Sequence, residues 1–326
     1  MKRFIIMGWV AFLLLFAWGT AQVSAGQKVR IGVLHRLGEH PDHIALRKGF
    51  LKGMKEKGYD VELTVFNVDV AKYRDTYAKR GIDEAKRMEK AGVEMIFCTG
   101  MYYIIKDAGI NIPIIDSIFL SPINWKYAVM KEGKMYCTGN ATGTIFGYSF
   151  KDIADFIQSV LPKAKKLAYI NNPESPVSRP ISELEKEAKR VGLEVTDCPF
   201  SAKDKAIDAI KKAVQDTDVA FSTNDLATMR VEEKVLKFAV DKKFPVVGGC
   251  LPFIKYGAVA GIQCNWFRSG EICADKADKI LKGRQANTIP IGSSDKADIA
   301  INLKEAKKMG IEVPYEWIEI ATEVVE

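Results

Sequence analysis

The sequence contains the same succession of strands and helices twice, and this repeat constrains the fold more than any other feature. Apolar runs alternate with amphipathic segments, and both copies predict strand, helix, strand, helix and strand. The first copy comprises residues 29–34, 44–57, 61–66, 73–91 and 93–98, and the second comprises residues 167–170, 181–191, 193–196, 206–214 and 219–221. Strands that alternate with helices pair in parallel and are buried on both faces. The sequence therefore predicts an α/β protein of two doubly wound, parallel-sheet lobes.

The segment between the two copies, residues 137–147, is rich in glycine and threonine. It is expected to cross between the lobes and to act as a hinge. Ligands bind beyond the carboxyl ends of the strands in such sheets, so the strand-end loops of both lobes should line a cleft. Residues 26–142 with about 265–287 are predicted to form lobe 1, and residues 143–264 with about 288–326 are predicted to form lobe 2.

Residues 1–25 have the order of a secretory signal peptide. Lys2 and Arg3 precede the apolar run 4–17, and small residues follow at 23–25, so cleavage is expected after Ala25. The apolar run is shorter than the roughly 18 residues that span a membrane. No cysteine follows at the position of a lipid anchor. The mature chain is therefore expected to be soluble in the periplasm.

Charge and cysteine content narrow the classes of partner and the expected cross-links. The formal net charge is +7, but lysine and glutamate are mixed along the predicted helices without a basic stripe, so nucleic acid is not an expected partner. Six cysteines in an exported protein favour disulfides. Cys250 and Cys264 flank a pair of predicted strands and are the best candidates for a bridge. Cys98, Cys198 and Cys273 are expected to be small buried hydrophobes.

All three histidines lie within residues 35–43, a grouping that first suggests a metal site. No cysteine or further histidine stands at ligand spacing, however, and Pro41 and Asp42 are ordinary helix-entry residues. The stretch is therefore interpreted as a cleft-lining loop that leads into a helix. Neither a metal nor a cofactor is expected.

In the first lobe, residues 98–103 lead from the third strand into a short helix. Backbone amides at Gly100 are expected to bind a ligand oxygen. Tyr102 and Tyr103 follow, and at least one of them is expected to face an apolar part of the ligand, unless one is core and the other solvated. The candidate ligand-binding residues of this lobe are Arg36, Glu39, Thr99, Gly100, Tyr102 and Phe119.

In the second lobe, the loop after the first strand contains Ser175, Pro176 and Ser178, which suit a helix N-terminus. This start is a second candidate cradle for ligand oxygens, although as helix caps these residues require no ligand. The candidate ligand-binding residues here, together with the return crossover to lobe 1, are Asn172, Ser175, Ser178, Thr223, Asn224, Cys250, Asn265 and Trp266.

Over essentially the whole mature chain, the sequence resembles the solute-binding proteins of ABC importers, in the family that includes tryptophan- and tyrosine-binding members. The matching stretches are residues 39–41, 47–50, 140–143, 221–225, 256–258, 270–283 and 302–310. The resemblance implies a periplasmic-binding-protein type I fold, with one small ligand enclosed between the lobes by hinge closure. It also implies a membrane permease as partner, and the repeated lobes suggest a monomer.

Three positions of the second lobe depart from the family pattern. Asn224, Cys250 and Asn265 stand where relatives often have acids, one of which can hold a ligand ammonium. A buried cation without a carboxylate partner costs on the order of several kcal/mol. The ligand is therefore expected to have an apolar or aromatic part and a neutral or anionic polar end. An aromatic or branched amino acid is the alternative.

Two rival classes of function were weighed against transport. A cofactor-independent racemase needs two thiols that face each other, but the repeat-equivalent of Cys98 is Ser222, and exported catalytic thiols are prone to oxidation. No catalytic residue is therefore proposed. A sensor that docks on a receptor kinase has the same fold and is not separated from a transport receptor by sequence.

Overall fold

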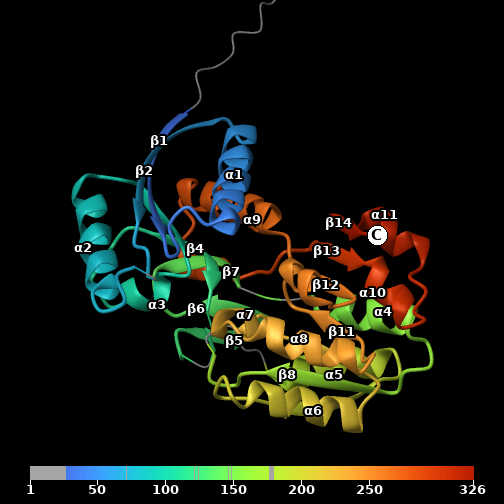
Figure 1. Ribbon diagram of the computed structural model, residues 1–326. Coiled ribbons are helices and arrows are strands. Elements are labelled where there is room, and N and C mark those ends of the chain that lie inside the picture. Colours follow the sequence, from blue (N-terminus) through green and yellow to red (C-terminus); the bar gives the residue numbers. More distant parts are fainter. Residues whose placement is uncertain are drawn as a thin grey trace, which may run out of the picture.

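The computed structural model describes residues 27–326, except for residues 71, 121, 124, 146, 148 and 176–179. The predicted signal peptide lies outside these residues, and so do the side chains of residues 228 and 229. Two lobes lie side by side, as expected for two doubly wound sheets joined by crossovers (Figure 1). No helix in the described part of the chain is long and apolar enough to cross a membrane.

The first lobe is built on a parallel sheet with the order β2-β1-β3-β4-β7. Its strands are β1 (Gln27–His35), β2 (Tyr59–Asn67), β3 (Met95–Thr99), β4 (Ile114–Phe119) and β7 (Ala141–Ile145). One core lies between the sheet and the helices α1 (Pro41–Glu56) and α9 (Trp266–Leu281). The other face packs against α2 (Tyr77–Lys90) and α3 (Tyr102–Ile105).

The second lobe contains a larger sheet with the order β14-β13-β12-β11-β10-β8-β9, in which only β12 and β13 pair antiparallel. Its strands are β8 (Lys166–Asn171), β9 (Glu194–Pro199), β10 (Val219–Ser222), β11 (Val246–Gly248), β12 (Ala260–Cys264), β13 (Ala297–Asn302) and β14 (Glu323–Val325).

Two further cores cover the faces of this second sheet. On one face lie α4 (Phe150–Val160), α5 (Ile181–Arg190), α10 (Leu303–Lys308) and α11 (Tyr315–Ile320). On the other face lie α6 (Ala206–Asp216), α7 (Asp225–Met229), α8 (Glu232–Asp241) and the 3-10 helix η1 (Leu251–Tyr256). A second 3-10 helix, η2 (Ala286–Thr288), precedes the return to β13.

The predicted repeat is confirmed, because every strand and helix of both copies forms, with bounds that differ by a few residues. In α1, Leu46, Phe50 and Met54 recur at i, i+4 and i+8, and all three are fully buried in the first-lobe core. Apolar residues at this spacing lie on one face of the helix, and that face packs against the sheet.

Residues 141–145 of the expected hinge instead form β7 at the edge of the first sheet, so this part of the crossover belongs to the first lobe. This strand has no apolar run, because its neighbours lie too close for large side chains. A Cβ at Gly143 would lie 1.8 Å from the Asp116 carbonyl oxygen, and the buried Thr144 hydroxyl donates to the Ser117 carbonyl at 2.7 Å. The first link between the lobes is therefore short and begins only after Ile145.

The segment before this strand, for which the repeat predicts no element, contains a two-stranded antiparallel hairpin. It consists of β5 (Ala128–Lys131) and β6 (Lys134–Cys137). Glu132 and Gly133 connect the strands with φ angles of 49° and 72°. Two consecutive residues in the left-handed region favour a tight hairpin turn. The lysine-rich sequence around them did not indicate strands.

All six cysteines are free and buried, so the expected bridge between Cys250 and Cys264 is wrong. The two thiols belong to different cores. Cys250 packs in the second lobe beneath the α6–α8 face, whereas Cys264 packs in the core of the first lobe. The expectation that Cys98, Cys198 and Cys273 are buried hydrophobes is confirmed.

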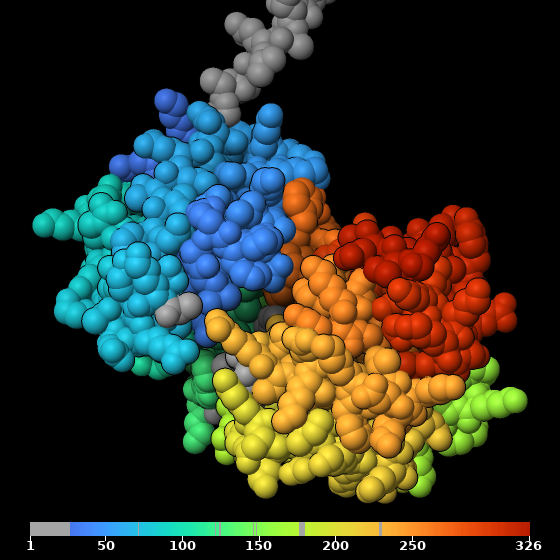
Figure 2. All heavy atoms as spheres, viewed as in Figure 1, coloured from blue at the N-terminus to red at the C-terminus, as the bar shows by residue number. Residues whose placement is uncertain are grey.

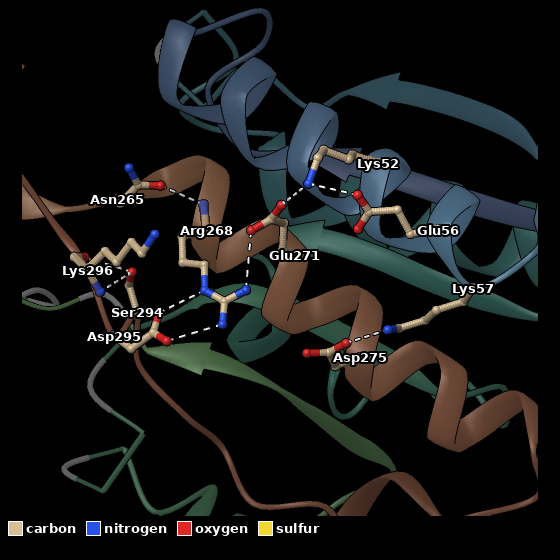
Figure 3. Close-up of polar contacts among 10 residues, drawn as sticks. All are labelled: Lys52, Glu56, Lys57, Asn265, Arg268, Glu271, Asp275, Ser294, Asp295 and Lys296. Carbon is tan, nitrogen blue, oxygen red and sulfur yellow. Dashed lines mark hydrogen bonds and ion pairs between the residues drawn. The ribbon is translucent and has the colours of Figure 1, made fainter.

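Helix α9 leaves the second lobe and packs against α1 of the first at very short range (Figure 1). A Cβ at Gly49 would lie 1.9 Å from the Phe267 carbonyl oxygen, and a Cβ at Gly270 would lie 2.1 Å from the Leu46 carbonyl oxygen. Lys52 and Glu271 pair beside this seam at 2.6 Å (Figure 3). Exposed ion pairs of this kind add little stability, so the backbone contact made possible by glycine holds the two helices together.

We expect Gly270→Ala to lower the free energy of unfolding by at least about 2 kcal/mol, because the new methyl group overlaps backbone atoms of α1 that have no room to move. Urea unfolding followed by circular dichroism measures this change. Gly292→Ala is the matched control, since its Cβ would meet only the flexible end of Lys276 at 3.8 Å. Equal stability of the two variants would contradict close packing at the seam.

Candidate ligand-binding site

The carboxyl ends of the parallel strands of both sheets meet at the junction of the lobes. In the first lobe, β7 ends at Ile145, immediately before the link to α4. In the second lobe, β12 ends at Cys264, and α9 of the first lobe begins at Trp266. The space-filling view shows a hollow between the blue surface of the first lobe and the yellow and orange surface of the second (Figure 2). Strand-end side chains of both lobes are thus brought to one region.

In the first lobe, the backbone amides expected to bind a ligand oxygen are occupied by a carboxylate of the protein itself. The amides of Gly100 and Ile118 donate to Asp116 Oδ1 at 2.7 and 2.9 Å, and the amide of Tyr102 donates to Oδ2 at 2.8 Å. Asp116 is 1% exposed, and burial raises the pKa of its carboxyl group while these amides oppose the rise. The cradle at Gly100 therefore positions the loop and is not open to a ligand.

In the second lobe, a buried carboxylate gathers donors from the loops beside the second predicted cradle, most of which lies outside the described residues. The Asn172 amide donates to Asp225 Oδ2 at 3.2 Å, the Thr223 hydroxyl donates to the same oxygen at 2.6 Å, and the Ser175 side chain also bonds to this carboxylate. Helix α5 begins only at Ile181, so Ser175 is not at a helix start. Ser178 lies outside the described residues.

Three of the predicted apolar contacts lie in the cores of the lobes. Tyr102 is 3% exposed, and its ring makes edge contacts with Phe119 and Tyr127 at centroid distances of 5.3 and 5.5 Å. Phe119 belongs to the same core, and Trp266 belongs to the core between α1, α9 and the sheet. The bulk and apolar character that made these residues candidates also suit them for burial.

Asn265 links two segments of chain that run between the lobes (Figure 3). Its amide group caps α9 by accepting from the Arg268 backbone amide at 2.6 Å and donates to Asp298 Oδ1 at 2.7 Å. Arg268 in turn forms an ion pair with Asp295 at 2.8 Å. The return segment at residues 295–298 is thereby fastened to the start of α9, and Asn265 serves the junction in this structure.

The remaining predicted residues have different surroundings. Thr99 is fully buried and accepts from the Arg36 backbone amide at 3.1 Å, and Cys250 is also buried. Glu39 is exposed and pairs with Arg47 at 3.1 Å, which lowers the pKa of Glu39. Asn224 is half-buried at the start of α7.

The structure brings Arg36 into the neighbourhood of Tyr103 and of Trp125, which sequence did not indicate. Arg36 is half-buried just after β1, and its Cδ lies 3.2 Å from where a Cβ on Gly100 would stand, three residues before Tyr103. The Tyr103 ring lies 4.8 Å from that of Trp125, centroid to centroid. Among the described residues Arg36 has no ion-pair partner, and its buried Nε has no hydrogen-bond acceptor. The ends of β1, β3 and β4 thus lead to a cation and two rings in one part of the first lobe, of which sequence indicated Arg36 and, as one of two alternatives, Tyr103.

Two further carboxylates outside the predicted ligand-binding set interact electrostatically across the lobes. Asp42 stands at the start of α1 in the first lobe, and Asp298 lies in β13 of the second. Burial raises the pKa of Asp42, and the negative charge of Asp298 adds to that rise. Burial also raises the pKa of Asp298. Asp42 follows the first predicted strand but has the sequence context of an ordinary helix-entry residue, and Asp298 lies outside both copies of the repeat.

A cavity of about 330 Å³ lies beside the links between the lobes. Its walls include Ile145, Gly147, Cys264 and Ser294, together with residues of α4 and α5. None of the predicted ligand-binding residues lines it. The cavity therefore belongs to the junction on the second-lobe side, apart from the loops that carry Arg36 and Tyr103.

The histidine-rich loop is a structural part of the first lobe. His35 and His43 are buried, and their rings stack with centroids 5.5 Å apart. His43 Nδ1 accepts from the Leu37 amide at 3.4 Å, and Arg47 Nη1 donates to His35 Nε2 at 3.1 Å. Within the described ranges, no group of three or more potential ligands could hold a metal ion. Burial, with neighbouring cations, lowers the pKa of His35 to about 4 and of His43 to about 3.

This pair predicts loss of stability in acid. An unfolded histidine takes up a proton near pH 6.5, whereas the folded pair stays neutral until about pH 4 or below, so the stability present above pH 6.5 falls as the pH is lowered. At pH 5 each histidine should cost about 2 kcal/mol relative to neutral pH. Denaturant unfolding from pH 7.5 to 5 should show a shallower slope for His43→Gln than for the wild type. The exposed His40 supplies the control, since His40→Asn should keep the wild-type slope.

Two similar α/β lobes, three links between them and strand-end loops that face one another define a two-lobed binding protein of the periplasmic-binding-protein type I fold. Residues 30–325 match the family model described as ABC transporter substrate binding protein, and the chain belongs to that family. This is a family of binding proteins and not of enzymes.

Known relatives span nearly the whole chain. A tyrosine-binding protein of Clostridioides difficile is 24% identical over 296 residues, which cover 89% of this chain and 84% of the relative. A ligand-free, open substrate-binding protein with adhesive properties from Clostridium difficile has a TM-score of 0.73 at 23% identity, covering 91% of this chain and 99% of that one. A Streptococcus pneumonia structure in complex with L-Trp has a TM-score of 0.68 at 18% identity, covering 92% and 100%. These structural likenesses establish the fold.

Proposed function

We propose that this substrate-binding protein is a monomeric periplasmic receptor, exported with cleavage after Ala25, that delivers an aromatic amino acid to an ABC permease. Lobe 1 would comprise residues 26–142 with about 265–287, and lobe 2 residues 143–264 with about 288–326. Since β7 pairs with β4, we extend lobe 1 to Ile145. A sensor role at a receptor kinase uses the same lobes, and genes for a permease and an ATPase beside this one would favour transport over that alternative.

The proposal rests first on Arg36. A half-buried guanidinium without an acidic partner among the described residues, and with an unsatisfied Nε donor, is costly unless a ligand supplies the anion. Arginine binds carboxylates with two parallel hydrogen bonds, so a ligand carboxylate suits this position. The anionic polar end expected from sequence is kept, but its binding position moves to Arg36, because Asp116 fills the amide cradle at Gly100.

The expectation that the ligand carries no ammonium group rested on Asn224, Cys250 and Asn265, where relatives often have acids. Asp298 lies within hydrogen-bonding distance of Asn265, and its charge acts on Asp42 of the opposite lobe. A positive group between these two carboxylates would relieve their repulsion, which supports an α-amino acid over its deaminated analogue. The relative named as tyrosine-binding supports an aromatic side chain.

Isothermal titration calorimetry tests the carboxylate anchor. We expect Arg36→Gln to weaken binding of L-tyrosine, L-tryptophan or L-phenylalanine about ten- to a hundredfold, because hydrogen bonds to a charged group are worth about 1.5 to 3 kcal/mol. Arg87→Gln, on the exposed side of α2, should bind like the wild type. The deaminated acids should bind the wild type more weakly than the amino acids. If no aromatic amino acid or deaminated acid binds the wild type, the proposed ligand class is wrong.

Closure of the lobes is tested by small-angle X-ray scattering with and without the tightest ligand found by calorimetry. We expect the radius of gyration to fall on binding, because two lobes on short links move as rigid bodies about a hinge. Binding at saturation without a change in the radius of gyration would rule out closure and leave a site on one lobe. A concentration series supplies the control, since a monomer keeps a constant forward scattering per unit mass.

A further inference from the structure

A continuous series of aromatic rings runs from the core of the first lobe to its surface. Phe119 contacts Tyr102, Tyr102 contacts Tyr127, and Tyr127 contacts Trp125, with centroid distances of 5.3, 5.5 and 6.4 Å. Trp125 at the outer end is 39% exposed. The three inner rings are buried, so they fix the position of the outer ring without competing with it for a ligand.

The turn that carries Trp125 is held by backbone hydrogen bonds. The amides of Tyr127 and Ala128 both donate to the Pro122 carbonyl at 3.1 Å, and the Lys126 amide donates to the Ile123 carbonyl at 3.0 Å. The Tyr127 hydroxyl donates to the Leu120 carbonyl. Backbone hydrogen bonds therefore tie the described residues 122–123 to residues 126–128 on the two sides of Trp125.

The Trp125 ring contacts that of Tyr103, and Tyr103 follows Gly100, against which the Arg36 side chain packs. An apolar ring face and a cation that can bind a carboxylate thus stand in the same part of the first lobe. Rings stack with centroids about 4.5 to 7 Å apart, and an exposed indole face offers such a partner to a ligand ring. Ile123, 42% exposed in the same turn, adds apolar surface beside the indole.

We propose that Trp125 and Tyr103 form the subsite for the ligand's aromatic ring, and that Trp125 selects aromatic over aliphatic carboxylates. This inference rests on the proposed function. The contact with the ligand ring that was expected of Tyr102 and Trp266 is assigned instead to Tyr103 and Trp125. Tyr102 packs against Tyr127, and Tyr127 packs against Trp125.

The test compares an aromatic with an aliphatic ligand. By calorimetry, Trp125→Leu should weaken binding of the best aromatic amino acid about ten- to a hundredfold and change that of L-leucine by less than about threefold, so the preference for the aromatic ligand collapses. Trp125→Phe keeps a ring and should retain most of the preference. Trp317→Phe is the matched control, because Trp317 packs against Phe156 in the other lobe at 5.2 Å.

A second readout does not depend on affinity. The mature chain is expected to keep Trp125, Trp266 and Trp317, so fluorine NMR of protein labelled with 5-fluorotryptophan should show three resonances, assigned with Trp125→Phe and Trp317→Phe. Adding the aromatic ligand should shift the Trp125 resonance and leave that of Trp317 in place. An aromatic ligand that binds tightly while the Trp125 resonance and the selectivity of Trp125→Leu stay unchanged would overturn this inference and leave the proposed function standing. Absence of any binding would instead refute the proposed function.

Discussion

The contact of α9 with α1 determines how the chain is shared between the lobes. Gly49 and Gly270 let the two backbones meet, and this buried seam is the reason that the chain leaves the second lobe after β12 and returns only at β13. If the chain had passed only once from the first lobe to the second, one link would join the lobes. Because the chain goes back to the first lobe for α9 and then returns for β13, three links join them. Three neighbouring links permit bending but resist twisting, so the strand ends of the two sheets stay opposite one another.

Each lobe has a buried aspartate beside the loops that follow its parallel strands. Asp116 and Asp225 each gather hydrogen-bond donors from the loops that follow the strands, although they come from different positions in the two copies. Open backbone amides at such an edge attract any anion. Because an internal carboxylate occupies them, recognition of a ligand passes to side chains such as Arg36, whose type is set by the sequence and not by the fold.

The fold could be predicted from sequence because the repeat fixes the order of strands and helices, and parallel pairing follows from that order. The segment at residues 141–145 could not, because a strand built from small residues against Asp116 looks like a loop. The candidate site was predicted less well. Strand ends indicated Arg36 and the pair Tyr102 and Tyr103, but which tyrosine faces outward depends on the direction of a four-residue helix, and Trp125 lies in a segment that the repeat does not contain.

The six free cysteines bear on how such a chain matures after export. Burial raises the pKa of Cys98, Cys250, Cys264 and Cys273, which keeps these thiols protonated near neutral pH. Thiol–disulfide exchange proceeds through the thiolate and needs access to the attacking sulfur. The folded protein is therefore kinetically shielded from oxidases and reductants alike. Only the nascent, unfolded chain exposes its thiols, so rapid folding takes the place that covalent cross-linking holds in many exported proteins.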